Sequence, residues 1–194
     1  QVISNSPTDA QPVFDAIVNS AARLFGRKTA LRLVEAEGLR RRARSYELTD
    51  GEYHGPDVVP IERDTLVGQV VLEGRAMQVA DVTAPDVPAQ LRARAPTLAF
   101  RSIASAPLMH EGHALGVLSL SSPDPGPLSE QQMALLATFA DQAVIAIQNA
   151  RLFRETQEAL EHQTATSEVL QVISRSTFDL EPVFSALAES AVRL

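Results

Sequence analysis

Two histidines lie close enough in the sequence to suggest a metal site. His110 and His113 flank Glu111–Gly112, so a tight turn would bring two imidazoles together, and a converging third ligand would complete a zinc site. Patterns this short often match by chance, and a solvated hairpin tip accounts for the same residues. We favour the hairpin tip and expect no metal site.

A basic stretch carries four arginines within five residues, at Arg40, Arg41, Arg42 and Arg44. No aromatic residues are interleaved with them, and the chain has a formal charge of −7, which argues against nucleic acid as the main partner. Arginines on an edge strand commonly prevent that strand from pairing with another one. We favour this interpretation; a surface for an anionic ligand or partner is the alternative.

The other chemistry-bearing residues do not predict catalysis. Asp81 and Asp86 flank a turn that contains Pro85, where aspartates more often cap a loop than act as general acid and base. The sequence shows no phosphate-binding glycine loop and no supported Ser–His–Asp set. It contains no cysteine, which excludes disulfides, thiol nucleophiles and thioether-linked chromophores. We expect no catalytic residue and no cofactor.

Length and composition are those of an ordinary globular protein. The 194 residues are 45% hydrophobic and 21% charged, which suits one domain and part of another. No apolar run approaches the roughly 18–20 residues of a membrane span, and no signal peptide opens the chain. These features predict a cytoplasmic protein with no membrane span in this segment.

The two ends of the sequence repeat each other. Residues 1–24 and 171–194 align without a gap and are identical at 14 of 24 positions. We interpret this as a 170-residue unit that begins again near the last residues, as in a piece of a tandem array. Residues 1–7 would then end a preceding linker helix, and residues 176–194 would form the first helix of a second, truncated unit.

Helix and strand signals alternate along the first 128 residues and predict an α+β fold, an antiparallel sheet flanked by helices. The expected order is a helix between the cap Asp9 and the stop Gly26, strands over 28–36 and 38–47, a loop over 49–60, a helix over 66–74 capped by Asp64 or Thr65, a strand over 77–81, an irregular crossover over 82–100 with a helical turn near 89–94, and a hairpin of strands 102–110 and 113–121.

A very long helix follows. Neither Gly nor Pro occurs from Ser129 to Ser174, which predicts a helix of about 70 Å, longer than the roughly 36 Å width of a body of this size. Its second half has residues spaced alternately three and four apart, typical of a coiled-coil seam with polar interruptions. The seam predicts a homodimer; a long surface helix without a signalling role is the alternative. Its residues are Leu152, Thr156, Ala159, Gln163, Thr166, Leu170 and Ile173.

Together these elements resemble the GAF domain over roughly residues 8–153. The matching stretches are Asp64–Arg75, Arg101–Ser102 with Ala106–Leu108, Gly116–Leu120 and Gln148–Phe153. The resemblance implies a PAS-like antiparallel sheet with the terminal helices on one face and a ligand pocket on the other. It also implies a bacterial sensor protein with several GAF domains, most often a histidine kinase. The expected GAF domain is 8–148, followed by a linker coiled coil over 149–175.

The sequence departs from the ligand-binding members of this family. Bilin-binding GAF domains attach their chromophore through cysteine, and free-methionine-sulfoxide reductases of this fold use catalytic cysteines; the chain has neither. The signature of cyclic-nucleotide-binding GAF domains is not visible. The resemblance therefore implies an architecture and a sensory role, and it leaves the ligand open.

Strand alternation predicts which residues face the pocket. Over 113–121, Leu118 and Leu120 should face the terminal helices, so that Leu115, Val117 and Ser119 face the other way. Small residues such as serine on that face would leave room for a ligand; a core filled by side chains is the alternative. The predicted pocket residues are Tyr46, Phe100, Arg101, Ile103, Ser105, Val117 and Ser119.

These inferences predict a non-catalytic sensory module that binds a small ligand or relays a signal through a dimeric helix. The expected partners are a second copy of the chain and further GAF and output domains of the same polypeptide, such as a histidine kinase domain. The alternatives are a ligand-free module for dimerisation and spacing in a tandem array, and a regulatory domain of a nucleotide cyclase.

Overall fold

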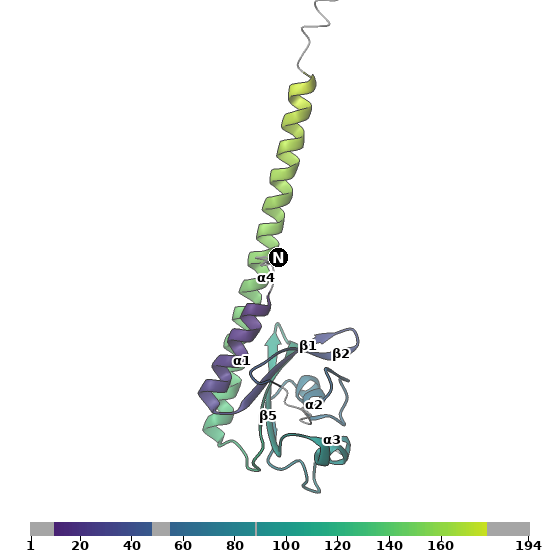
Figure 1. Ribbon diagram of the computed structural model, residues 1–194, viewed down its shortest axis with the longest axis vertical. Helices are drawn as coiled ribbons and strands as arrows, with labels where there is room; N and C mark the ends of the chain where they lie inside the picture. Colours follow the sequence, from purple (N-terminus) through teal and green to yellow (C-terminus); the bar gives the residue numbers. More distant parts are fainter. Residues whose placement is uncertain (1–9, 48–54, 88, 178–194) are drawn as a thin grey trace, which may run out of the picture. The chain divides into compact units, whose positions relative to one another are not determined.

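The structure is a computed structural model that describes residues 10–47, 55–87 and 89–177 (Figure 1). It divides into two compact units, residues 1–150 and residues 151–194. The predicted cap Asp9, the predicted linker residues 1–7 and most of the predicted second unit, residues 178–194, lie outside the described residues.

A six-stranded antiparallel sheet forms the centre of the first unit, in the order β3-β2-β1-β6-β5-β4. This confirms the predicted α+β fold. The strands are β1 (Lys28–Glu35), β2 (Gly38–Arg44), β3 (Val58–Val59), β4 (Met77–Val79), β5 (Ser102–His110) and β6 (His113–Ser122).

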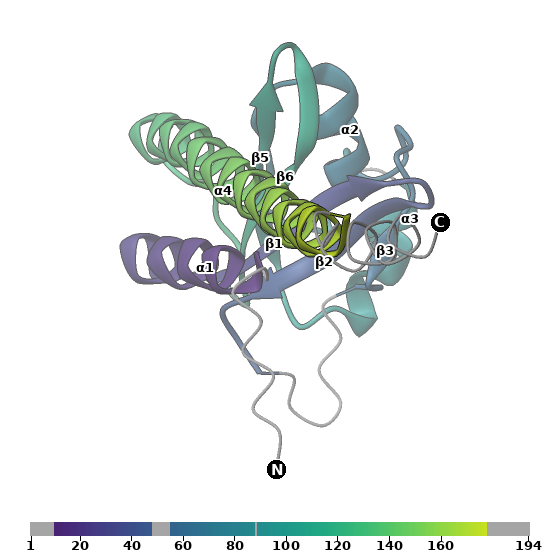
Figure 2. The ribbon, with the colours of Figure 1, turned by 90° about the horizontal axis from the view of Figure 1, so that it is seen from above.

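Helices cover both faces of the sheet. Figures 1 and 2 show α1 and the first part of α4 on one face and α2 and α3 on the other. The helices are α1 (Gln11–Phe25), α2 (Leu66–Glu73), α3 (Ala89–Arg94), a 3-10 turn (Ala95–Thr97) and α4 (Glu130–Thr177).

The predicted boundary residues Thr65, Gly26 and Gly74 act as expected, whereas the N-cap of α1 is Ala10 and not the predicted Asp9. Thr65 caps α2, because its side-chain oxygen accepts a hydrogen bond from the Gly68 amide at 3.1 Å. Gly26 ends α1 and Gly74 ends α2, with φ of 62° and 63°. This left-handed conformation is one that glycine adopts at little cost.

The main core lies between the sheet and the helices α1 and α4. Leu31 of β1 and Leu118 and Leu120 of β6 are fully buried there, together with Leu136 and Ala140 of α4. Because side chains alternate along a strand, the residues between these leucines face the opposite layer. The alternation predicted for Leu118 and Leu120 is therefore confirmed.

A bulge in β6 overturns the prediction for Leu115. Leu108 of β5 pairs with Gly116, whereas Met109 pairs with Ala114, so Leu115 is an extra residue in β6. A bulge interrupts the alternation of side chains, and Leu115 packs against the helix-side core instead of the pocket side.

The helix α4 is continuous over 48 residues. Within the first unit its residues Leu136, Ala140, Ala143 and Val144 are buried in the core. Among the described residues one helical stretch, Glu130–Thr164, is long and apolar enough to cross a membrane by length and composition, with a mean hydropathy of 1.2. One such helix is weak evidence of a membrane span; 28% of its most apolar window is buried, and these four residues pack on the sheet.

Candidate ligand-binding site

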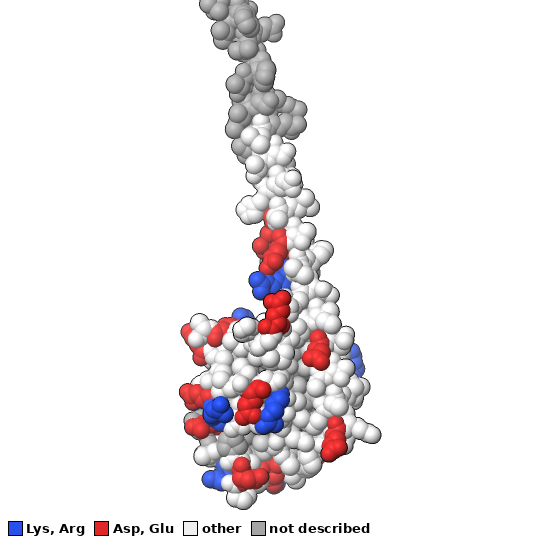
Figure 3. Space-filling model, turned by 180° about the vertical axis from the view of Figure 1, so that it is seen from behind, with Lys and Arg blue, Asp and Glu red and all other residues white. Residues whose placement is uncertain are grey.

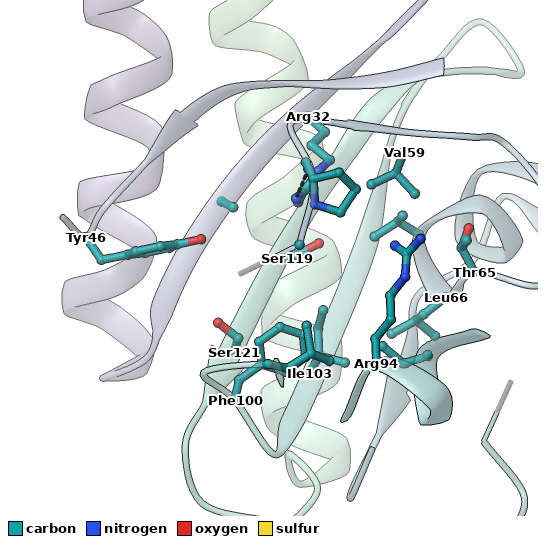
Figure 4. A pocket seen from close by; sticks show the side chains of 16 residues that line it. Arg32, Tyr46, Val59, Thr65, Leu66, Arg94, Phe100, Ile103, Ser119 and Ser121 are labelled. Carbon is teal, nitrogen blue, oxygen red and sulfur yellow. Dashed lines mark hydrogen bonds between the residues drawn. The ribbon is translucent and has the colours of Figure 1, made fainter. Parts of the chain in front are cut away.

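A cavity lies on the face of the sheet opposite α1 and α4 (Figure 4). Its volume is about 100 Å³, whereas roughly 10–15 Å³ is enough for one water molecule. The described residues that line it come from β1, β3, β5, β6, α2, α3 and the segments between them: Ala30, Arg32, Tyr46, Gly55, Pro56, Val59, Thr65, Leu66, Val67, Leu91, Arg94, Leu98, Phe100, Ile103, Ser119 and Ser121.

The two central strands, β1 and β6, form the floor of the cavity through their alternate residues. Ala30 and Arg32 of β1 face the cavity because Leu31 between them faces the helices. Ser119 and Ser121 of β6 lie on the same side by the same rule. The floor is therefore the reverse side of the strands that carry the main core.

Four of the seven predicted pocket residues line the cavity: Tyr46, Phe100, Ile103 and Ser119. Figure 4 shows that Tyr46 directs its ring and hydroxyl group toward the cavity. Phe100 and Ile103 also belong to a small cluster with Val82 and Ala95, so they connect the cavity to the crossover segment.

The other three predicted residues do not line the cavity, and two of them are buried within the protein interior. Val117 is fully buried in a cluster with Leu39, Val59 and Val70, beneath α2. Ser105 is also fully buried, and its Oγ lies 2.8 Å from the Oγ of Ser119, directly across the β5–β6 pair. The two serines bond to each other, which corrects the prediction that both leave room for a ligand.

The third, Arg101, is held by an aspartate outside the cavity. Its guanidinium forms a two-point ion pair with Asp81, with Nε 3.2 Å from Oδ1 and a second contact from Nη2 to Oδ2. The Thr83 amide and hydroxyl also donate to Asp81 Oδ1, at 2.9 and 2.8 Å. The Arg101 hydrogen bond, aided by Thr83, holds the pKa of Asp81 well below its ordinary value. Asp81 is thus a charged loop cap, as predicted.

Three of the four arginines of the basic stretch are ion-paired or bind main-chain carbonyls. Arg40 pairs with Glu35 at 2.8 Å, and Arg42 pairs with the same carboxylate. Arg41 lies 3.2 Å from Asp57, and its Nη2 donates to two carbonyl oxygens, those of Gly55 at 2.8 Å and Pro56 at 3.1 Å.

The strand that carries them, β2, is internal, because β3 pairs with its outer side. The prediction of an edge strand is therefore wrong. The bonds of Arg41 fix the segment 55–57 instead, and two residues of that segment line the cavity.

The two histidines occupy the hairpin tip that the sequence predicts. His110 and His113 are paired across a two-residue turn, in which Glu111 and Gly112 have φ of 49° and 80°. Two positive φ angles are typical of a tight hairpin turn. Among the described residues, no group of three or more His, Cys, Asp or Glu side chains is placed to hold a metal ion.

Two charged residues of the cavity, Arg32 and Arg94, escaped prediction. The alternation in β1 contained the signal for Arg32, since Leu31 and Leu33 are the apolar residues of that strand that pack on the helix side. Arg94 ends the short helix α3 in the irregular crossover. No periodic pattern there indicates a direction for its side chain.

The predicted coiled-coil seam lies on the part of α4 that belongs to the second compact unit, residues 151–194. The described seam residues are all exposed, and Leu152 and Leu170 are 58% and 60% exposed. Their neighbours Phe153 and Leu160 are 68% and 61% exposed. The side chain of Ile173 lies outside the described residues. Dimer formation through this seam stays a prediction.

The surface charges do not segregate on the face shown in Figure 3. Acidic and basic side chains are interspersed there, and opposite charges lie next to each other. This face offers no uniformly cationic surface of the kind that binds nucleic acid.

Comparison with known proteins identifies the family. The sequence profile of the GAF domain matches residues 7–148. No curated protein sequence matches the chain significantly. Among solved structures, the fold is similar to the blue-light-absorbing form of the PixJ GAF domain from Thermosynechococcus elongatus, with a TM-score of 0.64 and 16% identity over 84% of this chain and 98% of that one.

Two further structures show the same similarity. The GAF domain region of a putative membrane protein from Geobacter sulfurreducens has a TM-score of 0.60 and 25% identity, covering 75% of this chain and 97% of that one. A domain of a putative two-component sensor histidine kinase from Sinorhizobium meliloti has a TM-score of 0.57 and 16% identity, covering 74% and 93%. With the sheet, the flanking helices and the cavity in place, the chain belongs to the GAF domain family.

Proposed function

We propose that this GAF domain is a non-catalytic sensor that binds a small molecule in the cavity over its sheet. The observation that carries the proposal is the cavity itself, which is lined mainly by apolar side chains with a few polar groups. Such concave, mostly apolar sites are typical of small-molecule binding. The described lining residues include no Asp, Glu, His, Cys or Lys, so the serine and threonine hydroxyls there have no carboxylate, imidazole, thiol or amine of the lining beside them to act as a general base.

Strand β6 provides a direct route from the cavity to the helices. Ser119 lines the cavity, while its neighbours Leu118 and Leu120 are fully buried in the core that includes α1 and α4. A ligand that displaces β6 would change the surface on which α4 packs. The ligand shifts the equilibrium between two packings by the difference in its affinity for them.

The output in this proposal is a dimeric helix in the cytoplasm. The exposed Leu152, Phe153 and Leu160 of α4 have no described partner within the second unit, and a parallel second copy would bury them. The similarity to a sensor histidine kinase domain favours a kinase as the output domain. A thioether-linked chromophore is no part of the proposal, because the sequence has no cysteine.

A thermal-shift screen of metabolites and nucleotides tests ligand binding. A compound present at one hundred times its Kd stabilises the native state by about 2.7 kcal/mol. For a chain of this length that raises Tm by roughly 5–11 °C. The variant Leu98→Trp, which fills the cavity, should lose this shift. Leu72→Trp is the matched control, since Leu72 is 51% exposed on α2 and does not line the cavity.

Sedimentation equilibrium tests the helical output. We expect a dimer that dissociates when Leu160→Glu places a charge beside the seam, while Glu161→Gln leaves it intact. A dimer without any ligand-induced shift would favour the alternative of a ligand-free spacer. A monomer at high concentration would refute the relay through α4.

A further inference from the structure

The charged side chains among the described lining residues of the cavity have a single sign. Arg32 and Arg94 are the charged side chains among its described lining residues, whereas the whole chain has a formal charge of −7. Arg32 is only 6% exposed, and its Nη2 donates to the Pro56 carbonyl at 3.4 Å. The formal charges on the described lining are therefore positive, which favours an anionic ligand over a neutral one.

The serine and threonine hydroxyl groups of the cavity already form hydrogen bonds within the protein. Ser119 bonds to Ser105, and Ser121 donates to the Lys28 carbonyl at 3.4 Å. The Thr65 side-chain oxygen accepts a hydrogen bond from the Gly68 amide as the cap of α2. Among the described lining residues, the charged groups that can form new hydrogen bonds to a ligand are thus guanidinium groups, which donate and never accept, and the Tyr46 hydroxyl lies on the same cavity.

Arg94 has the greatest capacity of this kind. Within the described parts of the chain its side chain has no hydrogen bond or ion pair, and its guanidinium provides five N–H donors. Figure 4 shows the side chain extending from α3 into the space between the floor and α2. The fork of a guanidinium matches two oxygens of a carboxylate or of a phosphate.

Most of the remaining described lining is apolar and includes Val59, Leu66, Val67, Leu91, Leu98 and Ile103. A small, fully hydrated anion could pair with Arg94, but it would lose the rest of its water against these apolar side chains and gain no contact from them. We propose that the cavity binds a small organic carboxylate, with its charge on Arg94 and its apolar part against this lining. The proposal rests on the proposed function and specifies its ligand class.

Matched ligand pairs test the proposal on the full chain. Calorimetric titrations would compare hexanoate with hexanamide and benzoate with benzamide, with inorganic phosphate as the anion that lacks an apolar part. We expect each acid to bind about tenfold or more tightly than its amide, and Arg94→Gln to weaken binding of the acid by about tenfold. Arg75→Gln is the matched control, because Arg75 pairs with Glu73 outside the cavity.

The outcomes separate this proposal from the general one. Amides that bind as tightly as the acids, or an Arg94→Gln variant that keeps the affinity of the acid, would overturn the carboxylate while ligand binding in the cavity stands. If phosphate binds as tightly as the acids, the proposed contribution of the ligand's apolar part to binding would be overturned. Failure of every acid and amide would overturn the carboxylate proposal, and the metabolite screen with Leu98→Trp would decide ligand binding separately. Circular dichroism confirms that each variant is folded.

Discussion

The buried pair of hydroxyls beneath the cavity makes a quantitative prediction. Ser105 and Ser119 bond to each other at 2.8 Å, but only Ser119 lines the cavity. Removing Ser119 by Ser119→Ala leaves the Ser105 hydroxyl fully buried without its partner, which costs about 1–3 kcal/mol of unfolding free energy. Removing Ser105 by Ser105→Ala leaves the Ser119 hydroxyl beside a space that admits water, so the loss should be about 1 kcal/mol or less.

The double variant separates the bond from side effects. With both hydroxyls removed nothing is left unsatisfied, so the double variant should be destabilised less than the sum of the single changes, by roughly 1 kcal/mol or more. Urea denaturation followed by circular dichroism measures all three variants, and the m-value should stay unchanged. Additive single effects, or a larger loss for Ser105→Ala than for Ser119→Ala, would refute the reasoning.

Two further predictions concern α2 and the crossover. Gly68→Ala should destabilise the fold by about 1–3 kcal/mol or more, since a Cβ there would lie 2.2 Å from the Glu62 carbonyl oxygen; thermal denaturation measures this, and a loss no greater than that of the exposed Leu72→Ala would contradict it. Asp81→Asn should lower Tm at neutral pH, and its difference from wild type should shrink as the pH falls below the ordinary aspartate pKa of about 3.9. The reason is that Arg101 lowers the folded-state pKa of Asp81, so the stabilisation exists above the unfolded pKa and is lost on acidification. A difference in Tm that does not change with pH would count against the ion pair.

Local signals were sufficient for most of the fold. The turn at Glu111–Gly112 and the cap at Thr65 depend on residues adjacent in sequence, and both form as predicted. Alternation along β6 correctly placed Leu118 and Ser119 on opposite faces of the sheet. It failed at Leu115, because a bulge is created by the register of two strands and not by either sequence alone.

The candidate site was harder to predict because its walls come from distant segments. Arg101 is drawn away by Asp81, twenty residues earlier in the chain, and no local pattern indicates that pairing. Arg94 lies in an irregular crossover where neither helical nor strand periodicity applies. Arg32, in contrast, was predictable from the alternation of β1 once Leu31 was assigned to the helix side.

Methyl-detected NMR tests ligand binding in the cavity most directly. Val59, Leu98 and Ile103 line the cavity, whereas Leu136 and Val144 of α4 lie on the opposite side of the sheet and report transmission. We expect saturating hexanoate or benzoate to cause the largest chemical-shift changes at the cavity methyl groups and smaller changes at the α4 methyl groups. The Leu98→Trp variant should show neither change. Cavity methyl signals that stay unchanged at saturation of every acid, amide and metabolite tried would contradict a ligand-binding role for this domain.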